Sequence, residues 1–175
     1  MASRASMLDP IAADRAFIDG ASPLCPGNAV AALIQPGVGK YLMQLRDPIE
    51  QIFFPGHWGM FGGAVDSGES GFETLSRELN EELELEISEK DVEFFTRLDL
   101  DFSCAGHEKV WRDFYYVPIE PEQVSTLHLH EGTALAVFEA EEILLDSRVT
   151  PYDRWAIWLN ESKDRLVSSS DQSED

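Results

Sequence analysis

The stretch GAVDSGESGFETLSRELNEELEL, residues 63–85, decides the fold because it joins a glycine-rich loop to the most regular helical pattern in the chain. Ser70 is the predicted N-cap, and Glu73, three residues later, completes a capping box. The apolar side chains that follow recur at about 100° per residue and form one stripe: Phe72, Leu75, Leu79 and Leu83. The sequence therefore predicts an amphipathic helix over residues 70–83.

Three carboxylates lie beside that apolar stripe. Glu78, Glu81 and Glu82 share an arc of roughly 100°. Glu78, Glu82 and Glu86 also form an i, i+4 series of like charges, and each contact costs an isolated helix on the order of 0.2–0.5 kcal/mol. Arg77, four residues from Glu81, relieves only part of this repulsion. A hard divalent cation would relieve the rest, and oxygen-only ligands favour magnesium, manganese or calcium over zinc. The alternative is an ordinary solvated helix face.

Strand patterns flank this helix. The run NAVAALIQP from Asn28 predicts a strand, and KYLMQLRD, after the turn PGVG, is expected to pair with it as an antiparallel hairpin. Further strands are predicted at 92–102, 110–119 and 133–138, and further helices at 139–145 and 152–160. The pattern predicts an α/β fold with a mixed sheet.

The chain of 175 residues is long enough for one globular domain, expected over residues 28–162. Residues 1–27 are interpreted as an arm with a short helix around Asp9 to Phe17, and residues 163–175 as an acidic, disordered tail. Cys25 and Cys104 lie far apart, without the spacing of a metal site or a disulfide framework. We expect both to be free thiols.

The formal charge of −20, from 33 acidic and 13 basic residues, excludes a bare nucleic-acid backbone or an anionic membrane as a natural partner. A small phosphorylated substrate remains compatible, because bound divalent ions invert the local field. The sequence has no apolar run of the roughly 20 residues that cross a bilayer and no secretory signal pattern. We therefore expect a cytoplasmic protein.

Residues 63–85 resemble the Nudix box: a Gly, five residues, a Glu, seven residues, then Arg-Glu-apolar-any-Glu-Glu-any-Gly-apolar. The matching positions are Gly63, Glu69, Arg77, Glu78, Leu79, Glu81, Glu82 and Leu85. Glu84 stands where the family has Gly. A non-Gly residue in a left-handed C-terminal turn costs about 1 kcal/mol, or else the helix continues. The resemblance implies a Nudix-like α/β/α sandwich with a central mixed β-sheet.

The same resemblance implies the chemistry of a hydrolase that depends on Mg²⁺, with Mn²⁺ as a substitute. It would cleave the diphosphate linkage of a nucleoside diphosphate derivative, which is a nucleoside triphosphate, a nucleotide sugar or a dinucleotide. The implied metal ligands are Glu78, Glu81, Glu82 and the backbone carbonyl of Gly62 or Gly63. Arg77 completes the catalytic set, and Glu78 is the candidate base for the attacking water.

The family resemblance also implies roles for three further residues, and each role has an alternative. Glu69 would pair with Arg77 to tie the loop to the helix, or the two form a surface ion pair. Arg46 is a candidate for binding a substrate phosphate, or it caps a solvated strand end. Glu131 is a candidate for binding substrate or metal near a strand start, or it is a turn residue.

His107 and Arg112 flank the loop between two predicted strands and are interpreted as solvent-facing, with contact to a base or sugar as the alternative. The resemblance also implies that the protein could form a homodimer.

Two other functions compete with hydrolysis. A non-catalytic module would sense a nucleotide or bind a protein on the same fold, but such modules usually lose box carboxylates. A simple ion buffer would need a loop of the EF-hand type, and the sequence has none.

Overall fold

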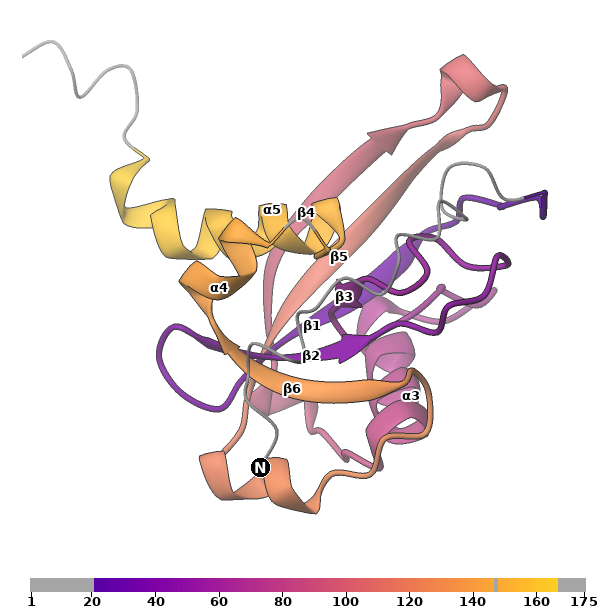
Figure 1. Ribbon diagram of the computed structural model, residues 1–175. Coiled ribbons are helices and arrows are strands. Elements are labelled where there is room, and N and C mark those ends of the chain that lie inside the picture. The colour runs from indigo at the N-terminus through magenta and orange to yellow at the C-terminus, as the bar shows by residue number, and fades with distance from the viewer. Residues whose placement is uncertain (1–20, 147, 167–175) are drawn as a thin grey trace, which may run out of the picture.

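The computed structural model describes residues 21–146 and 148–166 (Figure 1). The strands are β1 (Ala29–Gln35), β2 (Lys40–Leu45), β3 (Trp58–Gly59), β4 (Glu93–Asp101), β5 (Lys109–Pro118) and β6 (Ala134–Glu139). The α-helices are α3 (Gly71–Leu83), α4 (Ala140–Leu145) and α5 (Pro151–Ser162). Short 3₁₀ turns occupy Glu89–Asp91, Ser103–Ala105, Pro121–Thr126 and Lys163–Arg165. The helix expected around Asp9 to Phe17 and residues 167–175 of the expected tail lie outside the described residues.

The strands form two three-stranded sheets. In the order β1-β5-β4, β1 runs parallel to β5 while β4 runs antiparallel to it, so this sheet is mixed as predicted. The second sheet, β3-β2-β6, is antiparallel. The segment after β3 joins the two sheets, because Ala32 N donates to Phe61 O and Val30 N donates to Gly63 O, both at 2.9 Å. The glycine-rich loop is thereby fixed against β1.

The predicted hairpin of β1 and β2 is wrong. These strands belong to different sheets, and only the isolated bridge between Gly37 and Lys40 closes the turn that connects them. The physical reason lies in β1 itself, where every residue from Val30 to Ile34 is fully buried. Such a strand is covered on both faces, as strands in parallel pairs usually are, and takes its neighbours from distant segments.

Helix α3 has the predicted boundaries. The side chain of Ser70 accepts a hydrogen bond from the Glu73 backbone, and the Glu73 carboxylate accepts one from Ser70 N, so the capping box is present. The helix ends at Glu84, which is left-handed at φ 54° and ψ 30°. Leu85 N donates to Leu79 O at 3.1 Å beyond this turn. Glu84 therefore adopts the conformation that the family assigns to Gly.

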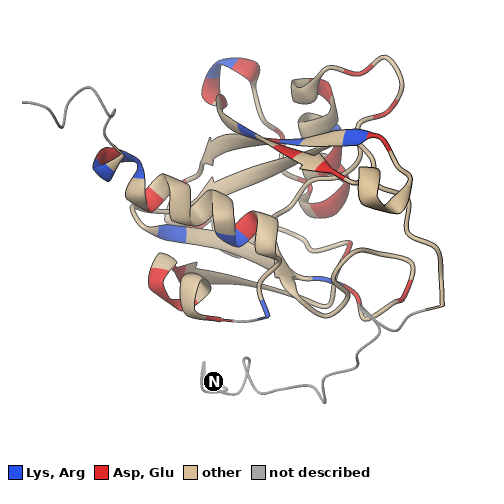
Figure 2. Ribbon diagram, turned by 90° about the horizontal axis from the view of Figure 1, so that it is seen from above, with Lys and Arg blue, Asp and Glu red and all other residues tan. Residues whose placement is uncertain are grey.

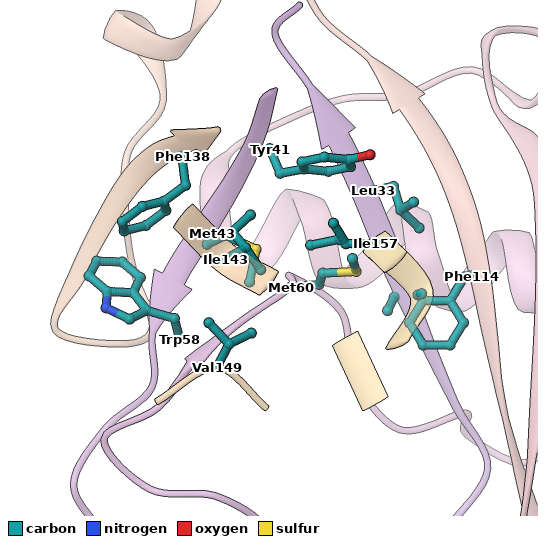
Figure 3. Close-up of a cluster of buried hydrophobic side chains, with 12 residues drawn as sticks. Leu33, Tyr41, Met43, Trp58, Met60, Phe114, Phe138, Ile143, Val149 and Ile157 are labelled. Atoms are coloured by element: carbon teal, nitrogen blue, oxygen red, sulfur yellow. The ribbon is translucent and has the colours of Figure 1, made fainter. Parts of the chain in front are cut away.

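Alternate side chains of β1 build two cores. Ala31 and Leu33 pack with Ala156 and Ile157 of α5, in the cluster that Figure 3 shows with the rings of Trp58 and Phe138 side by side. Val30, Ala32 and Ile34 pack instead with the α3 residues Leu75, Leu79 and Leu83. Helices α3 and α5 thus cover opposite faces, which is the predicted α/β/α sandwich (Figure 1).

Within the described part of the chain, no helix is long and apolar enough to cross a bilayer. Cys25 and Cys104 are both free and exposed, as predicted. Acidic positions are spread over helices, strands and loops and far outnumber basic ones (Figure 2). The basic side chains are therefore too few for each carboxylate to have its own cationic partner.

Candidate active site

Glu82 is the most unusual carboxylate of α3 because its side chain is buried, with a relative exposure of 3%. Its Oε1 accepts a hydrogen bond from Gln44 Nε2 at 3.0 Å, and its Oε2 accepts one from Gly62 N at 2.8 Å. Burial raises the pKa of Glu82 to about 7, against the opposing effect of these hydrogen bonds. Among the described residues, Glu82 has no cationic partner; both of its donors are neutral.

Glu78, one turn earlier on α3, faces the glycine pair of the loop. A Cβ on Gly63 would lie 2.5 Å from Glu78 Cδ, so only glycine permits this approach. Burial raises the pKa of Glu78, although the guanidinium of Arg77, with Nη1 at 2.8 Å from Oε1, opposes this shift. The charge of Glu131 raises the pKa of both Glu78 and Glu82 further. The fold therefore brings these carboxylates together electrostatically, with Glu131 at the exposed side.

Arg77 connects the helix to the loop that precedes it. Its Nε lies 3.0 Å from Glu69 Oε1 and its Nη2 lies 3.1 Å from Glu69 Oε2, which is a bidentate pair. Nη2 also donates to the backbone carbonyl of Ala64 at 3.2 Å. The hydrogen bonds from Arg77, together with one from Thr74, lower the pKa of Glu69 to about 2. The predicted pairing of Arg77 with Glu69 is confirmed.

Glu81 is the most exposed of the three box carboxylates on α3. Its side chain is 56% exposed and lies 3.3 Å from Arg77 Nη1. Within residues 21–146 and 148–166, no group of three or more His, Cys, Asp or Glu side chains is close enough to hold a metal ion. Arg77 Nη1 nevertheless contacts both Glu78, at 2.8 Å, and Glu81, at 3.3 Å, and the charge of Glu81 also raises the pKa of Glu78.

The residues that do meet here fit a hard divalent cation. Glu78 and Glu82 supply oxygen ligands only, next to the backbone of Gly62 and Gly63. Both carboxylates are desolvated and repel each other, which is the condition that a bound cation relieves. Gly62 is also confined, because a Cβ there would lie 2.5 Å from Val30 O. The chemistry of this donor set suits magnesium or manganese better than zinc.

Arg46 and Arg112 both have side-chain contacts that the sequence did not predict. Arg46 Nε donates to the backbone carbonyl of Phe53 at 3.0 Å, so this group holds the loop after β2. Arg112 was expected to face solvent, but its side chain is only 11% exposed and lies 3.4 Å from the buried Asp153. The expectation was wrong for Arg112 because the first turn of α5 covers this part of β5. His107 is exposed, as expected.

A cavity of about 540 Å³ lies beside this ion pair. Its walls are almost entirely apolar and include Phe53, Trp111, Tyr152 and Trp155. Arg112 is the one charged residue that lines it among those described. The cavity is on the α5 side of β1, and Ala29, which lines it, forms a bridge with Ala64 directly after Gly63. The cavity and the α3 carboxylates therefore meet at the same short loop.

Sequence reasoning missed Gln44, Asp153 and the burial of Arg112. Gln44 carried a usable signal, because a lone amide within the apolar run YLMQL is either exposed or hydrogen-bonded inside the protein. Asp153 carried none, since an acidic residue in the first turn of a helix is ordinary.

Comparison with known proteins agrees with this geometry. The sequence model of the NUDIX domain matches residues 26–159. The solution structure of the E. coli ORF135 protein is similar, with a TM-score of 0.62 and 25% identity over 89% of this chain and 98% of that one. A MutT NUDIX hydrolase from Burkholderia pseudomallei has a TM-score of 0.59 and 22% identity over 77% of this chain and 97% of that one. A C. elegans Ap4A hydrolase has a TM-score of 0.54 and 16% identity over 79% of this chain and 98% of that one.

The search of curated proteins finds no match to this sequence. The domain match nevertheless spans most of the chain, and the structural likeness extends over nearly the full length of the three proteins above. The chain therefore belongs to the Nudix family.

Proposed function

We propose that this protein is a magnesium-dependent hydrolase that cleaves the diphosphate linkage of a nucleoside diphosphate derivative and releases a nucleoside monophosphate or another phosphorylated product. The observation that carries the proposal is Glu82, a buried carboxylate held only by neutral donors, beside Glu78 and the Gly62–Gly63 backbone. Such a site leaves negative charge uncompensated. A divalent cation and its phosphate ligands would complete it.

The residues divide into three roles. Glu78 and Glu82, with a backbone carbonyl of the glycine pair, would hold the ion, and Glu81 is the candidate for a further ligand from the more exposed side. A bound ion bridges phosphate oxygens and lowers the pKa of its water. The raised pKa of Glu78 also suits the base that takes the proton of the attacking water. Arg77 and Glu69 keep the loop and helix in register.

Arg46 and Glu131 complete the proposal at the two ends of the site. Glu131 is exposed yet acts electrostatically on Glu78 and Glu82, so it is the candidate for a further contact to ion or substrate. Arg46 would contact a phosphate through its terminal nitrogens while Nε stays on Phe53. The strong acidic charge of −20 makes a small nucleotide, not a nucleic acid, the proposed partner.

The test is a substrate screen with the purified full chain. Nucleoside triphosphates, nucleotide sugars and dinucleoside polyphosphates are incubated with Mg²⁺ or with EDTA, and both products are identified. We expect magnesium-dependent release of a nucleoside monophosphate. Glu82→Gln should lower kcat/KM by at least about a hundredfold. Glu86→Gln is the matched control, because Glu86 is an exposed glutamate just beyond the end of α3, and the activity of this variant should not change.

Two outcomes would contradict the proposal. Unchanged turnover in Glu82→Gln would show that Glu82 does not hold the metal ion. Tight binding of a nucleotide by calorimetry, with no product after long incubation, would indicate a non-catalytic module on the Nudix fold instead.

A further inference from the structure

The C-terminal end of α3 binds a distant segment of the chain through its last carbonyl groups. A helix leaves the carbonyls of its last turn without partners inside the helix. Here Glu82 O accepts a hydrogen bond from His130 N at 2.9 Å, and Leu83 O accepts one from His128 N at 3.3 Å. The segment that precedes β6 therefore lies along the end of the helix that carries the box carboxylates (Figure 1).

The side chain of Glu84 adds a second contact between the same two segments. Its Oε1 lies 2.8 Å from His130 Nε2, and its Oε2 lies 3.5 Å from His128 Nδ1. Glycine, which the family has at this position, could form the left-handed turn but has no side chain to make these contacts. The contact with the histidines is therefore a feature of this chain and not of the box.

Glutamate is otherwise an unfavourable residue for this position. Its backbone is left-handed at φ 54°, where a side chain is strained. Its negative charge also lies at the C-terminal end of a helix, which is the negative end of the helix dipole. Glycine would avoid both penalties. The contact of Glu84 with His130 and His128 is what the structure offers in return.

Glu131 directly follows His130 and is held on its other side by β2. Thr133 N donates to Leu45 O at 2.8 Å, and Gly132 is confined because a Cβ there would lie 2.8 Å from the same oxygen. Glu131 therefore lies between a residue bound to the end of α3 and a residue packed on β2. Its backbone has little freedom to move away from the helix.

The charge of Glu131 acts on the carboxylates of the proposed ion site. It raises the pKa of both Glu78 and Glu82, so its negative charge is felt at both groups. A further negative charge near two carboxylate ligands increases the attraction of the site for a divalent cation. The size of this effect depends on where Glu131 is held.

We propose that Glu84 is a positioning residue: through His130 it holds Glu131 near Glu78 and Glu82 and so strengthens the binding of the divalent ion. This inference rests on the ion site of the proposed function and adds a residue to it. Glu84 acts through the backbone of the neighbouring segment and does not contact the ion. Glu84 and His130 are both about half exposed, so we expect an effect of about three- to fivefold on ion affinity, as for other exposed pairs.

Calorimetric titration of the full chain with Mn²⁺, after removal of bound metal with EDTA and dialysis, tests the inference without substrate. Glu84→Ala and His130→Ala should each weaken Mn²⁺ binding about three- to fivefold. The double variant should lose no more than either single variant, because both remove the same contact.

Two further variants separate the contact from the charge of Glu84. Glu84→Gln loses the charge but keeps an oxygen that accepts a hydrogen bond from His130, so it should retain most of the affinity. Glu86→Ala removes an exposed charge just beyond α3 and is the matched control without effect. A loss in Glu84→Gln as large as in Glu84→Ala would show that only the charge matters and would overturn the inference.

Variants of Glu131 test whether Glu84 acts through it. In a Glu131→Gln background, Glu84→Ala should cause no further loss of Mn²⁺ affinity. Hydrogen exchange of the metal-free protein follows the same contact directly, and the amide of His130 should exchange faster in Glu84→Ala than in wild type. A full additional loss of affinity in the Glu131→Gln background would contradict the path through Glu131.

Glu84→Gly separates positioning from stability. This change relieves the strained backbone, so the variant should be at least as stable as wild type in thermal melting. It also removes the carboxylate, so Mn²⁺ binding should weaken as in Glu84→Ala. A purely structural role would move stability and ion affinity in the same direction. Unchanged Mn²⁺ affinity in folded Glu84→Ala and His130→Ala would overturn the inference.

Ion binding and hydrolysis distinguish this inference from the proposed function. Weaker Mn²⁺ binding in Glu84→Ala, with no hydrolysis of any compound in the substrate screen, would contradict the proposed function and leave the positioning role standing. Magnesium-dependent hydrolysis by wild type, with equal Mn²⁺ affinity in wild type, Glu84→Ala and His130→Ala, would contradict the positioning role and leave the proposed function standing.

Discussion

The side-chain amide of Gln44 donates a 3.0 Å hydrogen bond to the carboxylate of Glu82 and so links strand β2 to helix α3. Gln44 is itself 3% exposed, so its amide has few orientations available. A Cβ on Gly132 would lie 2.8 Å from Gln44 Oε1, which shows how closely the turn after Glu131 packs on the same amide. Gln44 therefore lies between the buried carboxylate and the turn that carries Glu131.

Removal of this amide should weaken the binding of magnesium. Gln44→Leu replaces the amide with an apolar side chain of similar size. It therefore leaves Glu82 Oε1 without its hydrogen-bond donor. Groups that orient metal ligands contribute about 10–100-fold to metal affinity, and we expect a loss in that range. Isothermal titration of the free protein with Mg²⁺ or Mn²⁺ measures it. Gln51→Leu, at an exposed position, is the control, and equal affinity in both variants would mean that Gln44 only fills space.

The buried Glu82 should make stability depend on pH. Its pKa in the folded protein is about 7, above the usual 4.5. A raised pKa means that the folded state binds the proton more tightly, so the stabilisation is complete below pH 4.5 and is lost as pH rises through 7. In EDTA at pH 8, Glu82→Gln should therefore be more stable than wild type by up to roughly 3 kcal/mol.

Urea unfolding in EDTA at several pH values checks this expectation. The advantage of Glu82→Gln should shrink as pH falls toward 4.5, where the wild-type carboxyl carries its proton. Added Mg²⁺ should stabilise wild type at pH 8 more than the variant, because only wild type keeps both carboxylates. A stability difference that does not change with pH would show that Glu82 does not titrate in this range.

Gly63 should tolerate no side chain if Glu78 is to keep its place. A Cβ there would lie 2.5 Å from Glu78 Cδ, so Gly63→Ala must displace the carboxylate. Misplacement of a reacting group by about 1 Å can lower the rate by about a hundredfold, and we expect kcat to fall to that extent. Gly37→Ala, where the nearest side-chain atom is 3.7 Å away, is the matched control. A normal kcat in Gly63→Ala would show that the position of Glu78 does not matter for the reaction.

The sequence was most informative where structure is determined locally. The capping box of Ser70 and Glu73 and the apolar stripe predicted α3 to within one residue at its start, because both depend on neighbours within two helical turns. The bidentate pairing of Arg77 with Glu69 followed from a fixed spacing in the box. The strands β4 and β5 and the loop between them were also predicted, because each strand has its own local pattern, although their antiparallel pairing was not.

Features that depend on distant segments could not be predicted in the same way. Strand β1 pairs with β5, about eighty residues away, and not with its neighbour β2. No spacing rule places Asp153 of α5 behind Arg112 of β5, because the contact arises only when the helix packs on the sheet. Glu81 satisfied the family pattern, yet Arg77 competes for its carboxylate in the fold.

Glu84 gives a prediction about stability alone. It ends α3 in the left-handed region at φ 54°, where a side chain is strained and glycine is not. Glu84→Gly should therefore stabilise the protein by about 1 kcal/mol through the backbone. The same change removes the carboxylate that lies 2.8 Å from His130 Nε2 and 3.5 Å from His128 Nδ1, which opposes part of the gain.

A second variant separates these two effects. Glu84→Ala loses the carboxylate but keeps a Cβ in the left-handed turn, so it should be less stable than wild type. The difference between Glu84→Gly and Glu84→Ala in chemical unfolding then measures the backbone strain, about 1 kcal/mol. Glu86→Gly, at an exposed position without a positive φ, should destabilise, because glycine there adds only chain entropy to the unfolded state. If Glu84→Gly were no more stable than Glu84→Ala, the helix end would not be strained, and the departure from the box at this position would carry no energetic cost.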